Sequence, residues 1–409
     1  MSWRERLGLL GRNQAYAALW GARTVSTLGN WVTLTALLLY LESIGASGLQ
    51  IGIMLAAREL PHLLGPVAGA LADRVDQKRV MIGCDLTNSL LIGLILIWLP
   101  SFSILVALVA ASSLTAALFM PSGKSAVPKL VDQSDLTSAN ALLGSSTNLS
   151  FAVGPVIGAA LFAVVGVRGA LLLDVLTFLI SFSLLLRLPA FGGAATADGA
   201  VESLRTTRFV DEVRDGVTFV ARHKVARAVA IGMFLGVLFA AIDNVALVFL
   251  IRDSLGGPEI ALGTALGFYA VMMVLAPLIL IRFELFRARP SLILLVGLLL
   301  TSAGMFLTGL SPVVAAAVAA YAIAGAGNGL ENIGIDTLIG RSVPRDKLGR
   351  AFGVVYGPIA IAAGLAALIG GQIVDLTSPS TAFLVAGTGV GVVFLLVWKM
   401  LPRELQENR

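Results

Sequence analysis

The sequence predicts an all-α membrane protein with twelve transmembrane helices. Hydrophobic residues make up 57% of the 409 residues and charged residues only 13%, and the mean hydropathy is +0.91. Soluble domains carry about a quarter charged residues. Apolar runs of roughly 20 residues, enough to cross a ~30 Å hydrocarbon core, recur along the chain. Helices that cross a bilayer are therefore expected, since a soluble core could not hold this much apolar sequence.

The predicted spans follow one another with short connections. They cover approximately residues 14–42, 48–72, 79–99, 102–123, 136–166, 168–188, 226–252, 259–283, 290–310, 312–340, 347–376 and 380–401. Several are longer than the minimum, as tilted helices would be. Pro128 and Pro344 each precede a long Gly-rich span and predict the end of the helix before it.

The placement of lysine and arginine predicts that both termini are cytoplasmic. With that orientation, all but four of the 29 bases fall on the inner side. Arg23 and Arg58 lie within spans, and Arg168 and Arg252 lie in outer loops. The expected location is the bacterial inner membrane. The formal charge of +5 then reflects this topology and not nucleic-acid binding.

The side chains that most enzymes and metal sites need are sparse. The single cysteine, Cys84, excludes an internal disulfide and argues against a thiolate metal cluster. The two histidines, His62 and His223, are far apart in sequence. No G-x-x-x-x-G-K-[ST] nucleotide loop occurs. We therefore expect no cofactor, no metal and no enzymatic activity, and an ion gradient as the energy source.

A Gly/Ala-rich stretch near residues 191–203 divides the chain in two. Apolar residues then recur at helical spacing from Phe209 to Val220, which predicts an amphipathic helix on the inner membrane surface. The predicted division is an N-terminal six-helix bundle at 1–188, a cytoplasmic linker with this helix at 189–225, and a C-terminal six-helix bundle at 226–409.

A charged hairpin between spans 2 and 3, GALADRVDQKR, carries a family signature. It resembles the G-x-x-x-D-R/K-x-G-R-R/K loop of the major facilitator superfamily. The matching positions are Gly69, Asp73, Arg74, Lys78 and Arg79, whereas Asp76 stands where the family prefers glycine. A short basic cytoplasmic loop is the alternative interpretation.

The resemblance implies two pseudo-symmetric six-helix bundles that work by alternating access. It also implies a gate in which Asp73 meets the N-terminal end of span 11, where free amides carry partial positive charge. The residues assigned to this gate are Gly69, Asp73, Arg74, Arg79 and Arg350.

Two stretches resemble the bacterial exporter branch of the superfamily, which includes macrolide-type and siderophore-type efflux proteins. Residues 121–142 resemble the region between its spans 4 and 5. Gly154, Pro155 and Gly158 fit the antiporter signature G-x-x-x-G-P-x-x-G-G of span 5. In the family this signature accompanies export by shaping span 5 against span 8. A generic small-residue packing face with a proline kink is the alternative.

Ionisable and amide side chains inside spans are candidates for function because they are costly there. The proton-coupling candidates are Glu331, Glu59 and Asp243. The cavity and substrate candidates are Arg23, Asn30, Trp31, Arg58, His62, Asn244, Asn328 and Asn332. Asn328, Glu331 and Asn332 share one helix face. The alternative for Glu331 or Glu59 is a fixed ion pair with Arg23 or Arg58.

Together these features predict a monomeric secondary transporter. Its expected function is proton-coupled efflux of small amphipathic compounds, either drugs or siderophore-like metabolites, with acids that would suit a cation if they are unpaired. A lipid or lysophospholipid translocator of the same fold is the alternative. A membrane enzyme or scaffold is disfavoured by the absence of a nucleophile arrangement, a metal motif and a nucleotide loop.

Overall fold

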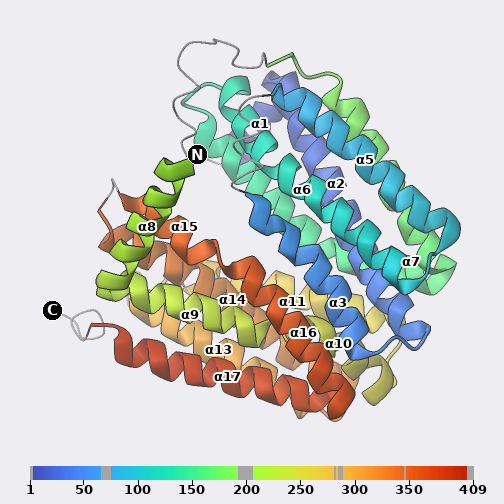
Figure 1. Ribbon diagram of the computed structural model, residues 1–409, viewed down its shortest axis with the longest axis vertical. Coiled ribbons are helices and arrows are strands. Elements are labelled where there is room, and N and C mark those ends of the chain that lie inside the picture. The colour runs from blue at the N-terminus through green and yellow to red at the C-terminus, as the bar shows by residue number, and fades with distance from the viewer. Residues whose placement is uncertain are drawn as a thin grey trace. The chain divides into compact units, whose positions relative to one another are not determined.

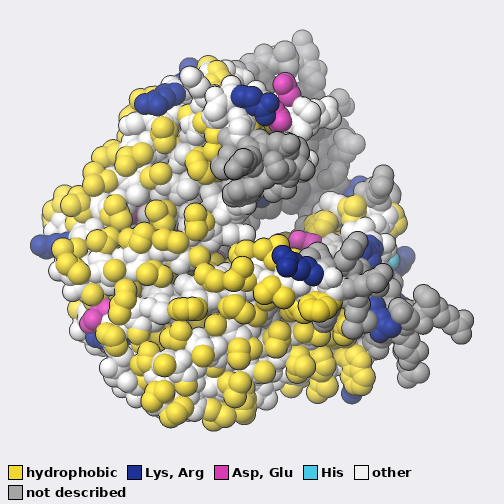
Figure 2. Space-filling model, turned by 180° about the vertical axis from the view of Figure 1, so that it is seen from behind, with side chains coloured by type: hydrophobic (Ala, Val, Ile, Leu, Met, Phe, Trp, Pro, Cys, Tyr) yellow, Lys and Arg dark blue, Asp and Glu magenta, His cyan; other side chains and the backbone are white. Residues whose placement is uncertain are grey.

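Long apolar helices make up most of the protein (Figure 1). The computed structural model describes residues 3–65, 75–191, 206–280, 282–283, 289–344 and 347–402, with side chains from residue 8 and, after the linker, from residue 214. Ten helices in these ranges are long and apolar enough to cross a membrane, and no strand occurs in them. On the face in Figure 2, hydrophobic side chains spread over the described helices and charged ones are few. The predicted all-α membrane fold is confirmed.

The chain forms two compact units. The first comprises Met1–Ile44 and Ala57–Ala197, and the second comprises Gly45–Ala56 and Asp198–Arg409. A short segment at the start of span 2 thus belongs with the second half of the chain. The division into bundles at 1–188 and 226–409 stays a prediction.

The first unit holds six described elements. They are α1 (Trp3–Arg12), α2 (Gln14–Ser43), η1 (Leu60–Leu64), α5 (Gln77–Trp98), α6 (Phe102–Leu130) and α7 (Leu136–Leu185). Side-chain caps fix two of the starts, as expected at free amide ends. The Asn13 side chain accepts a hydrogen bond from the Tyr16 amide at 2.9 Å. Asp76, the departure from the family signature, accepts from the Lys78 and Arg79 amides at the start of α5.

The 50-residue helix α7 contains both predicted spans 5 and 6. Gly166 interrupts it with φ +69° and ψ −174°, a conformation that glycine adopts far more readily than other residues. Contacts with α2 show that the chain reverses there. Before Gly166, positions 139, 154 and 158 meet 16, 31 and 32 in rising order. After it, positions 174 and 184 meet 33 and 21, so the order is inverted.

The second unit begins with the linker helix and continues through spans 7 to 12. Its elements are α8 (Thr206–Arg222), α9 (Lys224–Ala240), α10 (Asp243–Phe249), the π-helix η2 (Leu250–Ser254), α11 (Glu259–Leu280), α13 (Pro290–Gly309), α14 (Val314–Ser342), α15 (Leu348–Tyr356), α16 (Ile359–Leu376) and α17 (Pro379–Met400). Spans 7 and 11 are each broken, the latter at Gly357 and Pro358. Proline lacks the amide that would continue the helix.

The segment Gly45–Ala56 joins the second unit through the start of α3 (Gly48–Glu59). A Cβ on Gly52 would overlap the Ala367 carbonyl oxygen of α16, and one on Gly48 would lie 2.6 Å from the Gly371 oxygen. The Asp375 carboxylate accepts hydrogen bonds from the Gly48 amide at 2.6 Å and the Leu49 amide at 2.9 Å. Two glycines and one carboxylate therefore bring this helix end against α16.

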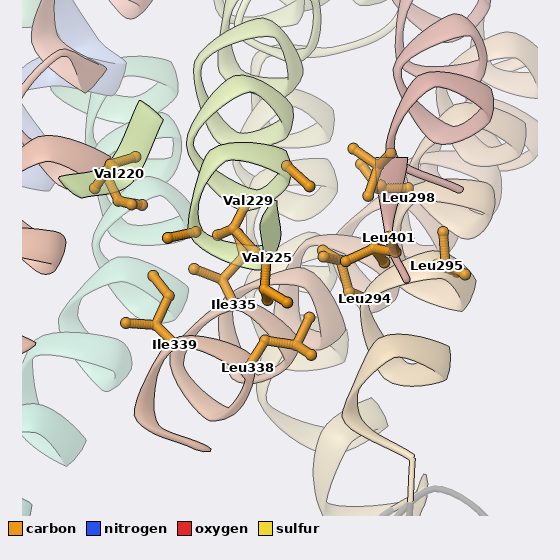
Figure 3. Close-up of a cluster of buried hydrophobic side chains, with 14 of the residues drawn as sticks. Val220, Val225, Val229, Leu294, Leu295, Leu298, Ile335, Leu338, Ile339 and Leu401 are labelled. Carbon is orange, nitrogen blue, oxygen red and sulfur yellow. The ribbon is translucent and has the colours of Figure 1, made fainter. Parts of the chain in front are cut away.

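Each unit has its own apolar core. In the second unit, α9, α13, α14, α15 and α17 contribute Val225, Leu294, Ile335, Val355 and Val397 (Figure 3 labels several of the cluster). In the first unit a second cluster is centred on Tyr16, Leu19, Met81, Val127 and Leu142.

Two predictions about helix ends have different outcomes. Helix α14 ends at Ser342, just before Pro344, as expected. The prediction that Pro128 ends its helix is wrong, because α6 runs on to Leu130. Since the missing proline amide falls in the last turn, it removes one hydrogen bond close to where the helix stops anyway.

The amphipathic linker helix is present as α8. Its described part packs on protein. Val220 is 4% exposed within the core cluster of the second unit, and the Lys347 ammonium lies 4.9 Å from the Phe219 ring centroid. Val217, in contrast, is half exposed.

Candidate translocation site

Glycines of α14 bring its neighbours into direct contact and so position Glu331. A Cβ on Gly325 or Gly329 would overlap the backbone of Tyr269 or Met273 in α11. On the α13 side, a Cβ on Gly327 would overlap Thr301. Close backbone approach of this kind is what small residues allow between membrane helices. The result is that one face of α14 is held tightly against the hydroxyl of Thr301.

Glu331 lies partly exposed near the middle of α14. Its Oε1 accepts a short hydrogen bond from the Thr301 hydroxyl of α13. The side-chain amide of the next residue, Asn332, donates to Oδ1 of Asn328, one turn earlier in the helix, at 3.1 Å. These contacts agree with the shared helix face expected for the three polar residues. Among the described residues of its unit, no lysine or arginine forms an ion pair with Glu331.

Asp243 begins α10 and is 4% exposed. The Tyr321 hydroxyl of α14 donates to its Oδ2 at 2.8 Å, and the Tyr321 ring stacks on Tyr269 with centroids 4.7 Å apart. Asn244 is exposed and donates to the Ala241 carbonyl at 3.1 Å. The structure thus separates two residues that are neighbours in sequence, one buried and the other at the surface.

Asp174 in the first unit is a buried carboxylate that is not among the predicted coupling or cavity residues. It is 0% exposed and accepts hydrogen bonds from the Thr33 hydroxyl at 2.7 Å and the Thr177 hydroxyl at 3.1 Å. A Cβ on Gly29 would overlap this carboxylate. The threonine three residues after Asp174 was a local signal, but Thr33 comes from a distant part of the chain.

Asp85 is a further buried carboxylate that is not among the predicted coupling or cavity residues. It lies in α5 and is 1% exposed. In the described part of the chain, its Oδ2 and the Ser181 hydroxyl are the buried side-chain atoms without a hydrogen-bond partner. This group is closed to solvent.

An arginine and two aromatic side chains of the first unit lie against one another. The guanidinium carbon of Arg58 lies 5.3 Å from the Trp31 ring centroid. The Trp31 ring meets Phe151 edge to face, with centroids 4.6 Å apart and planes at 60°. Nearer the N-terminus of α2, Arg23 Nη2 lies 3.6 Å from the Met120 sulfur. We call Arg58, Trp31 and Phe151 the arginine–tryptophan platform.

The remaining candidates of spans 1 and 2 do not form pairs. Glu59 and Asn30 are partly exposed, and His62 is exposed. Within the first unit, no described contact joins Glu59 to His62, Arg58 or Arg23, so the alternative of a fixed ion pair at Glu59 finds no support there. No group of three or more potential metal ligands occurs among the described residues.

The span 5 signature packs against span 1. A Cβ on Gly154 would lie 2.5 Å from Trp31 Cβ, and one on Gly158 would lie 2.6 Å from the Val32 carbonyl oxygen. Pro155 is buried between them. Within the first unit, the nearest neighbours of both glycines thus belong to α2. The contact with α2 positions the Trp31 ring.

The structure describes only some of the predicted gate residues. Gly69, Asp73 and Arg74 lie outside the described residues. Arg79 is exposed in the first turn of α5. Arg350 of α15 approaches Asp215 of α8, with Nη1 and Oδ2 3.9 Å apart and both side chains largely exposed.

The helical architecture defines the class of this protein by its fold, the major facilitator fold. Two solved structures share this architecture. The nucleoside transporter NupG matches with a TM-score of 0.69 and 14% identity, covering 94% of this chain and 98% of that one. A POT family transporter in complex with a thioalcohol-conjugated peptide matches with a TM-score of 0.72 and 14% identity, covering 95% of this chain and 97% of that one.

Sequence comparison gives the family. The profile of the transmembrane secretion effectors, a branch of the major facilitator superfamily, matches residues 10–408, and the chain belongs to this family. The uncharacterized MFS-type transporter YfiS of Bacillus subtilis is 26% identical, covering 98% of this chain and 96% of the relative. Macrolide efflux protein A of Streptococcus pyogenes is 23% identical, covering 91% and 92%. The predicted resemblance to the exporter branch is confirmed.

Proposed function

We propose that this protein exports small amphipathic compounds in exchange for protons by alternating access. Membership of the transmembrane secretion effector family supports transport. A relative that aligns along most of the chain is named for macrolide efflux, which supports export of amphipathic compounds. Proton coupling rests on the chain's own residues, and on Glu331 first.

The setting of Glu331 is the observation that carries proton coupling. A carboxylate inside a membrane protein needs a counter-charge or a proton, because its ionised form is poorly stabilised there. Glu331 has a neutral hydroxyl partner, Thr301, and no ion-pair partner within the described part of its unit. Its side chain is partly exposed, as the exchange of a proton with water requires. Glu59 and Asp243 remain further candidates for the same role.

The exchange cycle follows from this chemistry. When the site faces outward, the compound leaves and Glu331 takes a proton. When the site faces inward, Glu331 releases the proton and a new compound binds. Each unit of pH difference supplies about 1.4 kcal/mol per proton. The polar face that Glu331 shares with Asn328 and Asn332 offers hydrogen bonds to the compound during binding.

A resistance profile tests export directly. Cells that express the protein are challenged with cationic, neutral and anionic amphipathic compounds, with and without a proton uncoupler. Export predicts raised resistance to several of them, abolished by the uncoupler. Unchanged resistance combined with a changed distribution of lysophospholipids between the leaflets would contradict export and favour lipid translocation.

The Glu331→Gln variant tests proton coupling. Glutamine resembles the protonated acid, so we expect resistance and proton-driven transport to be lost while exchange of compound across the membrane continues. Asp253→Asn is a matched control, because Asp253 is an exposed carboxylate of the same unit. Uncoupler-sensitive export at the wild-type level in the Glu331→Gln variant would rule out this residue as the coupling site.

We also propose that Asp73 acts in the cytoplasmic gate, on the strength of the loop signature. The Asp73→Asn variant should transport more slowly while reaching wild-type expression, because it loses the negative charge that would meet the start of α15. Wild-type transport in this variant would remove the assignment.

A further inference from the structure

We propose that the arginine–tryptophan platform binds a negatively charged group of the exported compound, so that the substrates are flat amphipathic organic anions. This inference rests on the proposed export function and names its substrate class. It differs from the expectation, drawn from the acids in the sequence, that the site would suit a cation.

The platform is rigidly built from three helices. Arg58 comes from the end of α3, Trp31 from α2 and Phe151 from α7. Phe151 holds the Trp31 ring edge to face, and Gly154 leaves the space that the Trp31 side chain fills. Aromatic side chains fixed in this way offer a flat apolar surface to a ligand ring at little cost in side-chain entropy.

The guanidinium group of Arg58 has N–H donors that are available to a ligand. Stacking on Trp31 engages the face of the guanidinium group and leaves its five N–H donors, which lie in its plane, available. Among the described residues, Arg58 donates to no acceptor and no carboxylate lies within 4.0 Å of it. The side chain is also partly exposed. A guanidinium group in this state can bind a carboxylate or sulfonate with two parallel hydrogen bonds.

Arg23 adds a second positive charge to the same unit. Its described contact is with the Met120 sulfur, which is a weak acceptor. Arg23 and Trp31 are eight residues apart on α2, or about 12 Å along the helix axis. Positive charges inside a membrane span are costly without a counter-anion, and the described part of this unit supplies none to Arg23 or Arg58.

Four acids inside the described helices are, in contrast, already hydrogen-bonded or closed to solvent. Asp174 accepts two threonine hydroxyls, Asp243 accepts the Tyr321 hydroxyl, and Glu331 accepts the Thr301 hydroxyl. Asp85 is 1% exposed, so a ligand cannot reach it. Among the described residues, Arg58 and Arg23 have neither a carboxylate nor an oxygen acceptor, whereas Glu331 has the Thr301 hydroxyl, and this favours an anion at the platform.

The charge of the compound has a consequence for energetics. Exchange of one monoanion outward for one proton inward moves two positive charges into the cell, whereas the same exchange with a monocation moves none. An inside-negative membrane potential therefore drives export of the anion. A purely structural role of Arg58 would not make the rate of export depend on the membrane potential, so this dependence is a useful measurement.

Binding of two matched probes tests the proposal. The probes are 1-pyrenesulfonate, an anion, and 1-pyrenemethylammonium, a cation with the same ring. Energy transfer from tryptophan to pyrene reports binding to the purified protein in nanodiscs of zwitterionic lipid. We expect the wild-type protein to prefer the anion by about tenfold or more, the size expected for one charged hydrogen-bonded contact. Equal affinity or a preference for the cation would overturn the proposal without requiring any variant.

Substitution of Arg58 tests whether this residue causes the preference for the anionic probe. In Arg58→Gln the preference should fall to near unity through weaker binding of the anion, with the cation unaffected. Arg58→Lys keeps the charge but not the stacked, two-pronged geometry, so it should retain part of the preference. Arg187→Gln removes an exposed base of the same unit and should bind both probes like the wild type. If Arg58→Gln weakens both probes equally, the platform is only a packing feature and the proposal fails.

Transport in proteoliposomes separates this inference from the proposed function. Proton-driven export of 1-pyrenesulfonate, accelerated by an imposed inside-negative potential, supports both. Selective binding of the anion without proton-driven transport would retain the platform and contradict the export function. Proton-driven export of 1-pyrenemethylammonium alone would retain the export function and overturn the inference.

Discussion

Neutral hydroxyl groups, not bases, meet three of the acids inside this transporter. Thr33 and Thr177 donate to Asp174, Tyr321 to Asp243 and Thr301 to Glu331. A hydroxyl can donate to a carboxylate, and it can also accept from a protonated carboxyl group. Such a partner therefore satisfies an acid in either protonation state, whereas an arginine would hold it ionised.

The Tyr321–Asp243 contact supports a prediction at this scale. Tyr321→Phe keeps the ring that stacks on Tyr269 but removes the hydroxyl donor of a buried carboxylate. We expect a loss of about 1–3 kcal/mol in stability, measured as thermal unfolding of the purified protein.

The same substitution at Tyr356 provides the control. The Tyr356 hydroxyl donates to Asp336 at 2.6 Å, but Asp336 is exposed and water can replace the lost donor. Tyr356→Phe should change stability by no more than about 0.5 kcal/mol. Losses of equal size in the two variants would show that burial of Asp243 does not set the cost.

Among the elements, α14 depends most clearly on glycine. Gly329 lies where a Cβ would overlap the α11 backbone at Met273, whereas Gly340 of the same helix has no atom within 4 Å of its Cβ position. Gly329→Ala should destabilise the protein by about 1–3 kcal/mol through overpacking. Gly340→Ala should be neutral or stabilising by up to about 1 kcal/mol, because alanine favours helix. Chemical denaturation of both variants tests this, and a harmless Gly329→Ala would contradict the tight packing.

The cap between α16 and α3 supports a second prediction about an element. Asp375→Ala removes the acceptor of two amides at the start of α3 and should cost about 0.5–2 kcal/mol locally. Hydrogen exchange at residues 48–52 should accelerate. Ser378→Ala, which removes the cap of α17, is the control and should leave these amides protected. Unchanged exchange in Asp375→Ala would show that the glycine contacts alone hold the segment.

The sequence predicted the spans well because length and apolar composition are local properties. The helices from α5 through α17 begin and end within a few residues of the predicted spans, apart from the extension of α6 to Leu130 and the internal breaks of spans 7 and 11. The prediction at Pro128 was wrong because a proline near the last turn of a helix removes little of its stability. The grouping of residues 45–56 with the second half could not be predicted from the sequence. It depends on contacts between glycines of α3 and residues of α16, including Asp375, that lie some 320 positions later in the chain.

The candidate site was predictable only in part. The shared face of Asn328, Glu331 and Asn332 follows from helical spacing. The partners Thr301, Tyr321 and Thr33, and the stacking of Arg58 on Trp31, arise from contacts between helices that one sequence does not reveal.

For the whole molecule, the proposed orientation makes a direct prediction. Cys84 is buried, and its replacement by alanine gives a cysteine-free background. A cysteine at position 168 should react with a membrane-impermeant maleimide in intact cells, whereas one at position 187 should react only in inside-out vesicles. Both positions are exposed. The reverse pattern would invert the proposed topology.

The turn at Gly166 also bears on how the protein is made. Only one residue separates the helical parts of α7 that run along α2 in opposite directions. During synthesis, the first of these segments cannot insert into the lipid bilayer while the second is still in the ribosome exit tunnel, because the connection between them is too short. We expect the insertion machinery to accept residues 136–185 as a single hairpin, and a longer connection at position 166 to let the two segments enter separately.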